Sequence, residues 1–200
     1  MWKNIWIPAF ERGKEQEDNE TTMSVERYQR FLLWLDARPG VKRAVIFLDR
    51  WLPLVPFAGY PVLLVLLNLQ LFRLMGAGQR EAVLEMMQHI ARAVFVPALT
   101  LWGGTVLRRK LDLPRPYDQP GFTPLVAKET RGRSFPSRHA LSAAVLAAVW
   151  LYFYPFVGRI MTAVALGIGA LRVMAGVHFV RDVAAGFALG FALGAAGMWL

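Results

Sequence analysis

The sequence predicts an all-α integral membrane protein: a bundle of about five transmembrane helices preceded by an N-terminal interfacial segment. The first observation is composition, since 56% of the 200 residues are hydrophobic and only 18% are charged. A soluble domain of this size needs more polar cover. The second is that the apolar residues form long blocks, as membrane-spanning helices require. The third is the lack of cysteine, which excludes a disulfide scaffold, a thiolate metal site and a thiol nucleophile.

Five apolar blocks approach the length of about 20 residues that a helix needs to cross a bilayer. Three prolines crowd the first block and predict that its regular helix starts near Tyr60 or is kinked. The fourth block holds Arg172 and His178 in its later half. The blocks occupy residues 51–72, 90–107, 140–158, 160–180 and 183–200.

The first 50 residues differ from the rest of the chain. They hold nine basic and eight acidic residues, and their apolar patches are too short to span a membrane. Leu32, Leu33, Trp34 and Leu35 predict an interfacial amphipathic helix that ends at Arg38-Pro39-Gly40. We therefore divide the chain into a charged interfacial segment, residues 1–50, and a transmembrane domain, residues 51–200.

The last block repeats glycine every four residues, at Gly186, Gly190 and Gly194. Small residues at this interval allow two helices to approach closely in lipid. The stripe is either an intramolecular packing face, which we favour, or the contact of a homodimer.

Positive charge gathers in the long connection between the second and third blocks. From Arg108 to His139 there are eight lysines and arginines against three acids, so this stretch carries +5 of the net charge of +9. Five prolines between residues 114 and 136 keep it irregular. This concentration of charge predicts an anion site.

His178 and Asp182 are four residues apart, which on one helix places them on the same face. A carboxylate there accepts the Nδ1 proton and leaves Nε2 as a lone pair that can attack an electrophile. Arg172 falls off that face on a regular helix. Ionisable residues inside a span are costly and usually mark a site.

Two further clusters suit an anionic substrate. Ser137 is a predicted N-cap before the third block, and a helix N-terminus attracts anions. His139 then lies in the first turn, where it can exchange a proton with a bound phosphate. Pro114 and Pro116 fix the backbone around Arg115, and arginine gives phosphate two parallel hydrogen bonds.

Together these clusters resemble the type 2 phosphatidic acid phosphatase superfamily, whose pattern reads K-x6-R-P, then P-S-G-H, then S-R-x5-H-x3-D. The corresponding residues here are Arg108-x6-Arg115-Pro116, Pro136-Ser137-Arg138-His139 and Leu171-Arg172-x5-His178-x3-Asp182. The resemblance covers residues 90–200. Arg108 stands where the pattern has lysine, Arg138 where it has glycine and Leu171 where it has serine; none of these changes removes a reacting group.

The resemblance implies a role for each matched residue. His178 attacks phosphorus and forms a phosphohistidine, which Asp182 orients and supports. His139 protonates the leaving oxygen and then activates water. The phosphoryl oxygens are bound by the side chains of Arg108, Arg115 and Arg172 and by the main-chain N–H groups of Ser137 and Arg138. The resemblance implies neither a metal nor a cofactor.

We therefore expect a membrane lipid-phosphate phosphatase whose partners are its lipid substrate and membrane lipids, with no nucleic acid. We favour a polyprenyl pyrophosphate, such as undecaprenyl pyrophosphate, over phosphatidic acid and phosphatidylglycerol phosphate. This preference rests only on the resemblance to the superfamily. The alternatives are a lipid phosphotransferase with the same intermediate and a non-enzymatic protein that binds anionic lipids. The resemblance implies a multi-pass protein of the cell membrane with an extracytoplasmic site, whereas the positive-inside rule applied to the basic connection gives the reverse.

Overall fold

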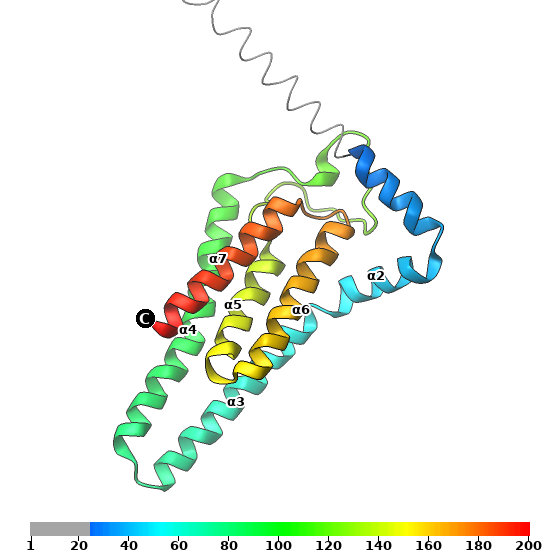
Figure 1. Ribbon diagram of the computed structural model, residues 1–200. Coiled ribbons are helices and arrows are strands. Elements are labelled where there is room, and N and C mark those ends of the chain that lie inside the picture. Colours follow the sequence, from blue (N-terminus) through cyan, green and yellow to red (C-terminus); the bar gives the residue numbers. More distant parts are fainter. Residues whose placement is uncertain (1–24) are drawn as a thin grey trace, which may run out of the picture.

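The computed structural model describes residues 25–200, and within this range the chain is helical with no strand (Figure 1). This confirms the predicted all-α class. Residues 25–36 form a first helix. The elements that follow are α2 (Pro39–Trp51), α3 (Leu54–Gly76), α4 (Arg80–Leu111), the short 3₁₀ helix η1 (Pro116–Asp118), α5 (Arg138–Phe153), α6 (Pro155–Met174) and α7 (Val180–Trp199).

Four helical stretches within the described residues are long and apolar enough to cross a membrane: Pro39–Gly76, Arg80–Asp118, Pro155–Met174 and Val180–Trp199. The remaining predicted span corresponds to α5, which is apolar but has only 16 residues. At a rise of about 1.5 Å per residue, α5 is about 24 Å long, shorter than the apolar core of a bilayer. It is nevertheless the central helix, because every residue from Ala140 to Trp150 is buried.

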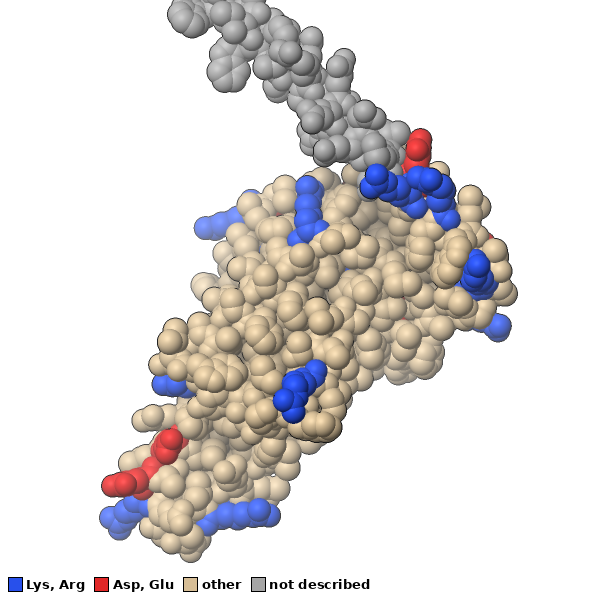
Figure 2. Space-filling model, in the orientation of Figure 1, with Lys and Arg blue, Asp and Glu red and all other residues tan. Residues whose placement is uncertain are grey.

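The outer surface of the bundle suits a hydrocarbon environment. Large apolar side chains such as Val65, Leu99 and Trp102 are more than half exposed. Figure 2 shows that charged atoms on this face gather mainly toward its two ends, with a mostly uncharged band between them. The long uncharged surface is therefore the part of the molecule that contacts lipid tails.

The boundaries of all five spans differ from those predicted: α5 ends at Phe153 rather than at residue 158, and α7 begins at Val180 rather than at residue 183. Helix α3 begins at Leu54 and continues through Pro61, so the expected start near Tyr60 was wrong. Helix α6 ends at Met174 rather than near residue 180, because Gly176 adopts a φ of +72° and turns the chain toward α7. Helix α4 extends at both ends beyond the predicted block, over 32 residues.

The glycine stripe of α7 packs against α5 of the same chain. A Cβ atom added at Gly186 would lie 2.6 Å from the carbonyl oxygen of Ser137, and one at Gly194 would lie 2.7 Å from the Cβ of Ala148. Gly190 likewise lies against the main chain of Leu141. The stripe is thus an intramolecular packing face, as the favoured alternative predicted, and these three glycines are covered by α5 rather than free to contact a second copy.

The helix at residues 25–36 and α2 lie at one end of the bundle, beside the α6–α7 connection. Leu35 and Val45 are buried together with Leu171 of α6. The first helix ends before Pro39, as the sequence predicts. Residues 1–24 of the predicted interfacial segment lie outside the described part of the chain.

Candidate active site

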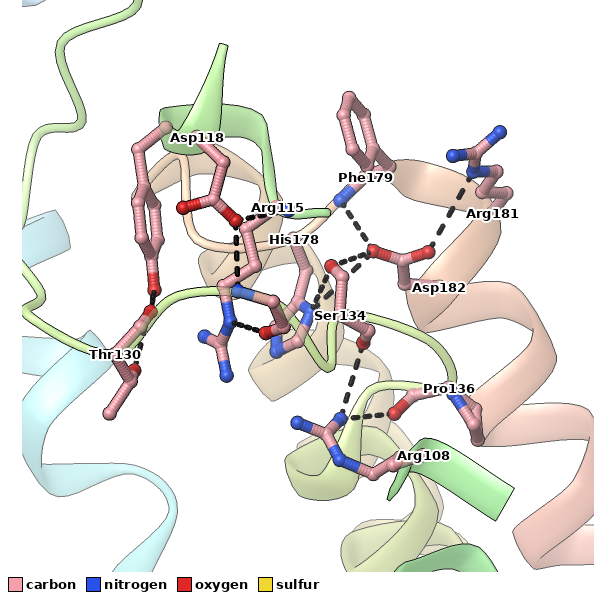
Figure 3. Close-up of polar contacts among 12 residues, drawn as sticks. Arg108, Arg115, Asp118, Thr130, Ser134, Pro136, His178, Phe179, Arg181 and Asp182 are labelled. Atoms are coloured by element: carbon pink, nitrogen blue, oxygen red, sulfur yellow. Dashed lines mark hydrogen bonds and ion pairs between the residues drawn. The ribbon is translucent and has the colours of Figure 1, made fainter. Parts of the chain in front are cut away.

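The polar residues of the three sequence clusters meet at one end of the bundle. The last turn of α4, the irregular connection from residue 112 to 137, the first turn of α5 and the α6–α7 connection all converge there (Figure 1). Figure 3 shows the side chains of Ser134, His178 and Asp182 pointing toward one another, with Arg108 and Arg115 nearby. These side chains are separated by up to 74 residues in the sequence but share one small volume.

His178 and Asp182 are in contact, but not because they share a helical face. His178 lies in the connection before α7, and Asp182 lies in the first turn of α7. The Asp182 carboxylate accepts a hydrogen bond from the main-chain N–H of Phe179, with 3.2 Å between N and Oδ2, which caps the helix. The same oxygen lies 3.6 Å from Nδ1 of His178. The predicted contact between His178 and Asp182 is therefore present, and it forms because Asp182 lies in the first turn of α7, next to the connection that carries His178.

Ser134 completes this group, and sequence reasoning assigned it no role. Its hydroxyl donates a short hydrogen bond to Oδ2 of Asp182 and lies 3.3 Å from Nδ1 of His178. Because the Ser134 proton is directed at Asp182, its lone pair faces the imidazole. Ser134 lies two residues before the Pro136-Ser137-Arg138-His139 motif, and no spacing rule connects it to a residue 48 positions away.

Two acceptors therefore face Nδ1 of His178, which assigns the imidazole proton to Nδ1 and leaves a lone pair on Nε2. Burial lowers the pKa of His178 below its ordinary value; the hydrogen bond to Asp182 acts in the opposite direction, and the positive charge of Arg115 lowers it further. His178 is only 4% exposed. The imidazole is thus neutral near pH 7, the form in which it can act as a nucleophile.

Arg108 lies in the last turn of α4 and is buried. Its terminal nitrogen Nη1 donates to the carbonyl oxygen of Ser134 at 3.2 Å and also to the carbonyl oxygen of Pro136. Arg108 therefore ties the segment that carries Ser134 to the end of α4. It brings a positive charge near His178 at the same time.

Arg115 is held by a small network around Asp118. The Asp118 carboxylate accepts hydrogen bonds from the main-chain N–H groups of Arg115 (2.8 Å) and Gly132 (3.0 Å). Nε of Arg115 donates to the carbonyl oxygen of Gly132 at 2.8 Å. Asp118 thus fixes the Arg115 backbone, and the guanidinium extends toward the group around His178 (Figure 3).

The start of α5 differs from the expected cap. Ser137 occupies the N-cap position, but its side chain makes no capping bond. Its main-chain N–H donates to the carbonyl oxygen of Asp182 at 2.8 Å, so that N–H is already used. Its hydroxyl oxygen is buried without a hydrogen-bond partner among the described residues. Arg138, which is exposed, and His139, which is half-buried, follow in the first turn, where helix N–H groups have no intrahelical acceptor.

Arg172 comes from the last turn of α6 and is paired with Asp49 of α2, an acid that the sequence analysis did not connect to the site. The distance from Nη1 of Arg172 to Oδ2 of Asp49 is 3.4 Å, and Nη2 donates to the Asp49 carbonyl oxygen at 3.1 Å. Nε is buried and has no hydrogen-bond partner among the described residues. The Nε–H of this guanidinium is therefore available to a ligand.

The family model of the PAP2 superfamily matches residues 90–200, which is more than half of the chain and contains every predicted site residue. The chain belongs to the PAP2 superfamily. All three motif clusters of this PAP2 chain lie inside the matched region, whereas α2, α3 and the helix at residues 25–36 lie outside it.

Similar proteins include phosphatidylglycerophosphatase B of Bacillus subtilis (strain 168), which is 40% identical over 86 residues. That match spans 38% of this chain and 41% of the length of the relative. The structure of LpxE from Aquifex aeolicus is 22% identical, with a TM-score of 0.51 and coverage of 70% of this chain and 87% of that one. A PAP2 type phosphatidylglycerolphosphate phosphatase from Bacillus subtilis is 23% identical, with a TM-score of 0.46 and coverage of 88% and 93%.

The likeness to LpxE supports the fold of this PAP2 chain. Within residues 25–200, no group of three or more His, Asp or Glu side chains is arranged to hold a metal ion. The polar groups that face the site are instead arginine guanidinium groups, hydroxyl groups and helix N–H groups. Such donors bind a phosphoryl group as charge develops on its oxygens.

Proposed function

We propose that this protein is a lipid-phosphate phosphatase that acts through a phosphohistidine on His178. The observation that carries the proposal is the environment of that imidazole. Nδ1 faces the Asp182 carboxylate and the Ser134 hydroxyl, and Nε2 keeps its lone pair in a buried site near two arginines. A neutral, oriented imidazole beside positive charge suits attack on a phosphate ester.

The proposed reaction has two steps that use the same pair of histidines. In the first, Nε2 of His178 forms a bond to phosphorus, the bond from phosphorus to the lipid oxygen breaks, and His139 gives that oxygen a proton. In the second, His139 takes a proton from water, whose oxygen attacks phosphorus and breaks the bond to Nε2. Inorganic phosphate leaves, and Asp182 supports the positive charge on His178 in both steps.

The proposed phosphate ligands are Arg108, Arg115, Ser137, Arg138 and Arg172. Two contributions differ from those the family resemblance implies. Ser137 acts through its unpartnered hydroxyl, because its N–H already donates to Asp182. Arg172 acts through Nε, because its terminal nitrogens contact Asp49. We assign no metal and no cofactor to the reaction.

The substrate is a lipid that carries a phosphate or pyrophosphate headgroup. The name of the Bacillus subtilis relative makes phosphatidylglycerol phosphate the first lipid to test. The other two lipids to test are a polyprenyl pyrophosphate, which the resemblance to the superfamily favours, and phosphatidic acid. The apolar surface described above allows such lipids to reach the site from within the bilayer.

We propose that the site faces the extracytoplasmic side of the cell membrane. Residues 25–51 contact the site end of the bundle, and α7 runs away from it, so Trp199 lies on the opposite side. The chain has no cysteine, which permits single-cysteine labelling in intact cells. A cysteine at the exposed Arg131 is expected to react with a membrane-impermeant reagent, and one at the exposed Ala77 is not.

The direct test is phosphate release by the purified protein in detergent with EDTA present. His178→Ala is expected to lower kcat by on the order of 10³-fold or more, because it removes the nucleophile. His89→Ala is the matched control: His89 contacts Tyr152 at 3.2 Å on the far side of the bundle, so phosphate release is expected to persist.

Substrate labelled in the phosphate group separates the three functions. Labelled inorganic phosphate supports the phosphatase, and label on a lipid or sugar acceptor supports a phosphotransferase. Lipid binding that survives His178→Ala, without release from any of the three lipids, supports the anionic-lipid binder and contradicts the proposal.

A further inference from the structure

The buried pair of Asp49 and Arg172 joins two regions that are 123 residues apart. Asp49 lies on α2, and both side chains are at least nine-tenths buried. Because both terminal nitrogens of Arg172 contact Asp49, the guanidinium plane is fixed and its Nε–H is left without a partner. A buried donor held in this way is suited to a ligand that supplies the missing acceptor.

Tyr28 makes a second link from the N-terminal side. Its hydroxyl donates to the carbonyl oxygen of Met174 at 3.0 Å and accepts from the main-chain N–H of Leu125 at 3.1 Å. Its ring stacks on Phe122, with 4.5 Å between the ring centroids. Tyr28 therefore connects the end of α6 to the basic connection that precedes α5.

Tyr28 also lies directly against the turn that leads to His178. A Cβ atom added at Gly176 would lie 2.5 Å from the Tyr28 hydroxyl. Beyond that turn, the main-chain N–H groups of Val177 and His178 both donate to the carbonyl oxygen of Arg172, at 3.1 and 3.3 Å. The position of the nucleophile thus depends on the end of α6, which Tyr28 and Asp49 both hold.

We propose that Tyr28 and Asp49, two residues of the N-terminal segment 25–51, are a working part of the active site, and we call this pair the N-terminal clamp. Asp49 positions Arg172 for the phosphoryl group, and Tyr28 positions the turn that carries His178. The clamp lies outside the region matched by the family model, so neither residue belongs to the three motifs. This inference rests on the proposed function, and both are positioning residues because they act through Arg172 and His178.

The two links are expected to affect different kinetic quantities. Asp49→Asn removes the charge that holds Arg172, so the inhibition constant for inorganic phosphate rises about tenfold and kcat/KM falls by a similar factor. Tyr28→Phe loosens the turn before His178, so kcat falls severalfold while the inhibition constant for phosphate stays unchanged. This split separates a positioning role from a general loss of folded protein.

Matched controls are available in the same chain. Tyr60 donates to the carbonyl oxygen of Ala93 at 3.0 Å, away from the site, and Asp36 forms an exposed ion pair with Lys42 at 2.5 Å. Tyr60→Phe and Asp36→Asn are expected to leave both kinetic quantities at their original values. An Asp49→Asn or Tyr28→Phe variant that behaves like its control overturns the corresponding link.

A double-mutant cycle tests whether Asp49 acts through Arg172. Asp49→Asn combined with Arg172→Ala is expected to match Arg172→Ala alone, whereas Tyr28→Phe combined with Arg172→Ala is expected to show both single-variant effects, because Tyr28 acts on the turn before His178 rather than through Arg172. If the double variant instead shows the product of the fold-changes of Asp49→Asn and Arg172→Ala, the proposal is overturned. If Asp49→Asn does not fold, Asp49→Glu keeps the charge, displaces Arg172 and is expected to raise the phosphate inhibition constant.

A binding measurement separates failure of the clamp from failure of the proposed reaction. Inorganic phosphate that binds the folded protein raises its melting temperature, whether or not any lipid is hydrolysed. We expect this rise for the unchanged protein and a smaller one for Asp49→Asn at the same phosphate concentration. Equal rises in melting temperature for the unchanged protein and Asp49→Asn overturn the proposed role of the clamp. A rise without phosphate release from lipid overturns the reaction and leaves the clamp supported.

Discussion

The two ends of the helical bundle carry the same kinds of side chain in opposite environments. At the site end, His178, Asp182, Arg172 and Arg108 are each at most 9% exposed. At the other end, Arg73, Arg80, Glu81 and Glu85 flank the α3–α4 turn and are exposed. Burial of a charge is costly unless it is paired, so ionisable residues at the site end persist only within a connected network. Connection and burial, rather than residue type, distinguish a site from a membrane interface.

The histidines show the same contrast. His178 contacts an aspartate and a serine, whereas His89 contacts the Tyr152 hydroxyl and packs edge-on against the rings of Tyr152 and Phe153. Arg92 near that end donates to the carbonyl oxygen of Met198 at 3.4 Å, at the last turn of α7. These contacts stabilise the bundle and involve no carboxylate that could activate a nucleophile.

The largest difference between the ends is expected for the two acids Asp182 and Glu85. Asp182→Asn preserves the size of the side chain and an acceptor for the Phe179 N–H but removes the charge that supports His178. By analogy with the aspartate of a Ser-His-Asp triad, kcat is expected to fall on the order of 10³- to 10⁴-fold. Glu85→Gln is expected to leave phosphate release unchanged. An Asp182→Asn protein that keeps a tenth of the original kcat contradicts the role given to this carboxylate.

Local spacing predicted much of the site, and contacts between distant segments accounted for the rest. The spacing of His178 and Asp182 predicted their contact correctly, although the cause is a capped helix start rather than one helical face. Glycine at every fourth residue predicted a close-packed face but left its partner open. Asp49 and Ser134 were missed because their partners lie 123 and 48 residues away, and no local period encodes such a pairing.

A smaller effect is expected where α7 packs on α5. A Cβ at Gly190 lies within repulsive distance of the Leu141 carbonyl oxygen, so Gly190→Ala forces the two helices apart. Overpacking of this kind costs about 1–3 kcal/mol, which for a chain of this size lowers the melting temperature by roughly 2–12 °C. Gly103→Ala is the control, because nothing lies within 4 Å of its added Cβ. Equal melting temperatures for the two variants would be inconsistent with the intramolecular packing of the stripe.

The smallest expected effect is a displacement of the acid limb of the pH profile of kcat/KM. Burial lowers the pKa of His178 below its ordinary value, and the charge of Arg115 lowers it further. Neutral imidazole is the active form, so the acid limb is expected at a pH below 6.5, the ordinary pKa of histidine. Removal of the positive charge in Arg115→Gln raises the pKa of His178, and the acid limb therefore moves toward higher pH by less than about one unit.

Arg115→Lys separates this charge effect from phosphate binding. Lysine retains the positive charge but not the planar pair of donors, so kcat/KM falls while the acid limb stays in place. The substrate phosphate itself titrates near pH 6, and that contribution is the same for all three proteins. The difference in pH between the acid limbs of Arg115→Gln and Arg115→Lys thus reports the pKa of His178 alone. If both limbs coincide with that of the unchanged protein, Arg115 does not act on the His178 proton, and its role is confined to the phosphoryl oxygens.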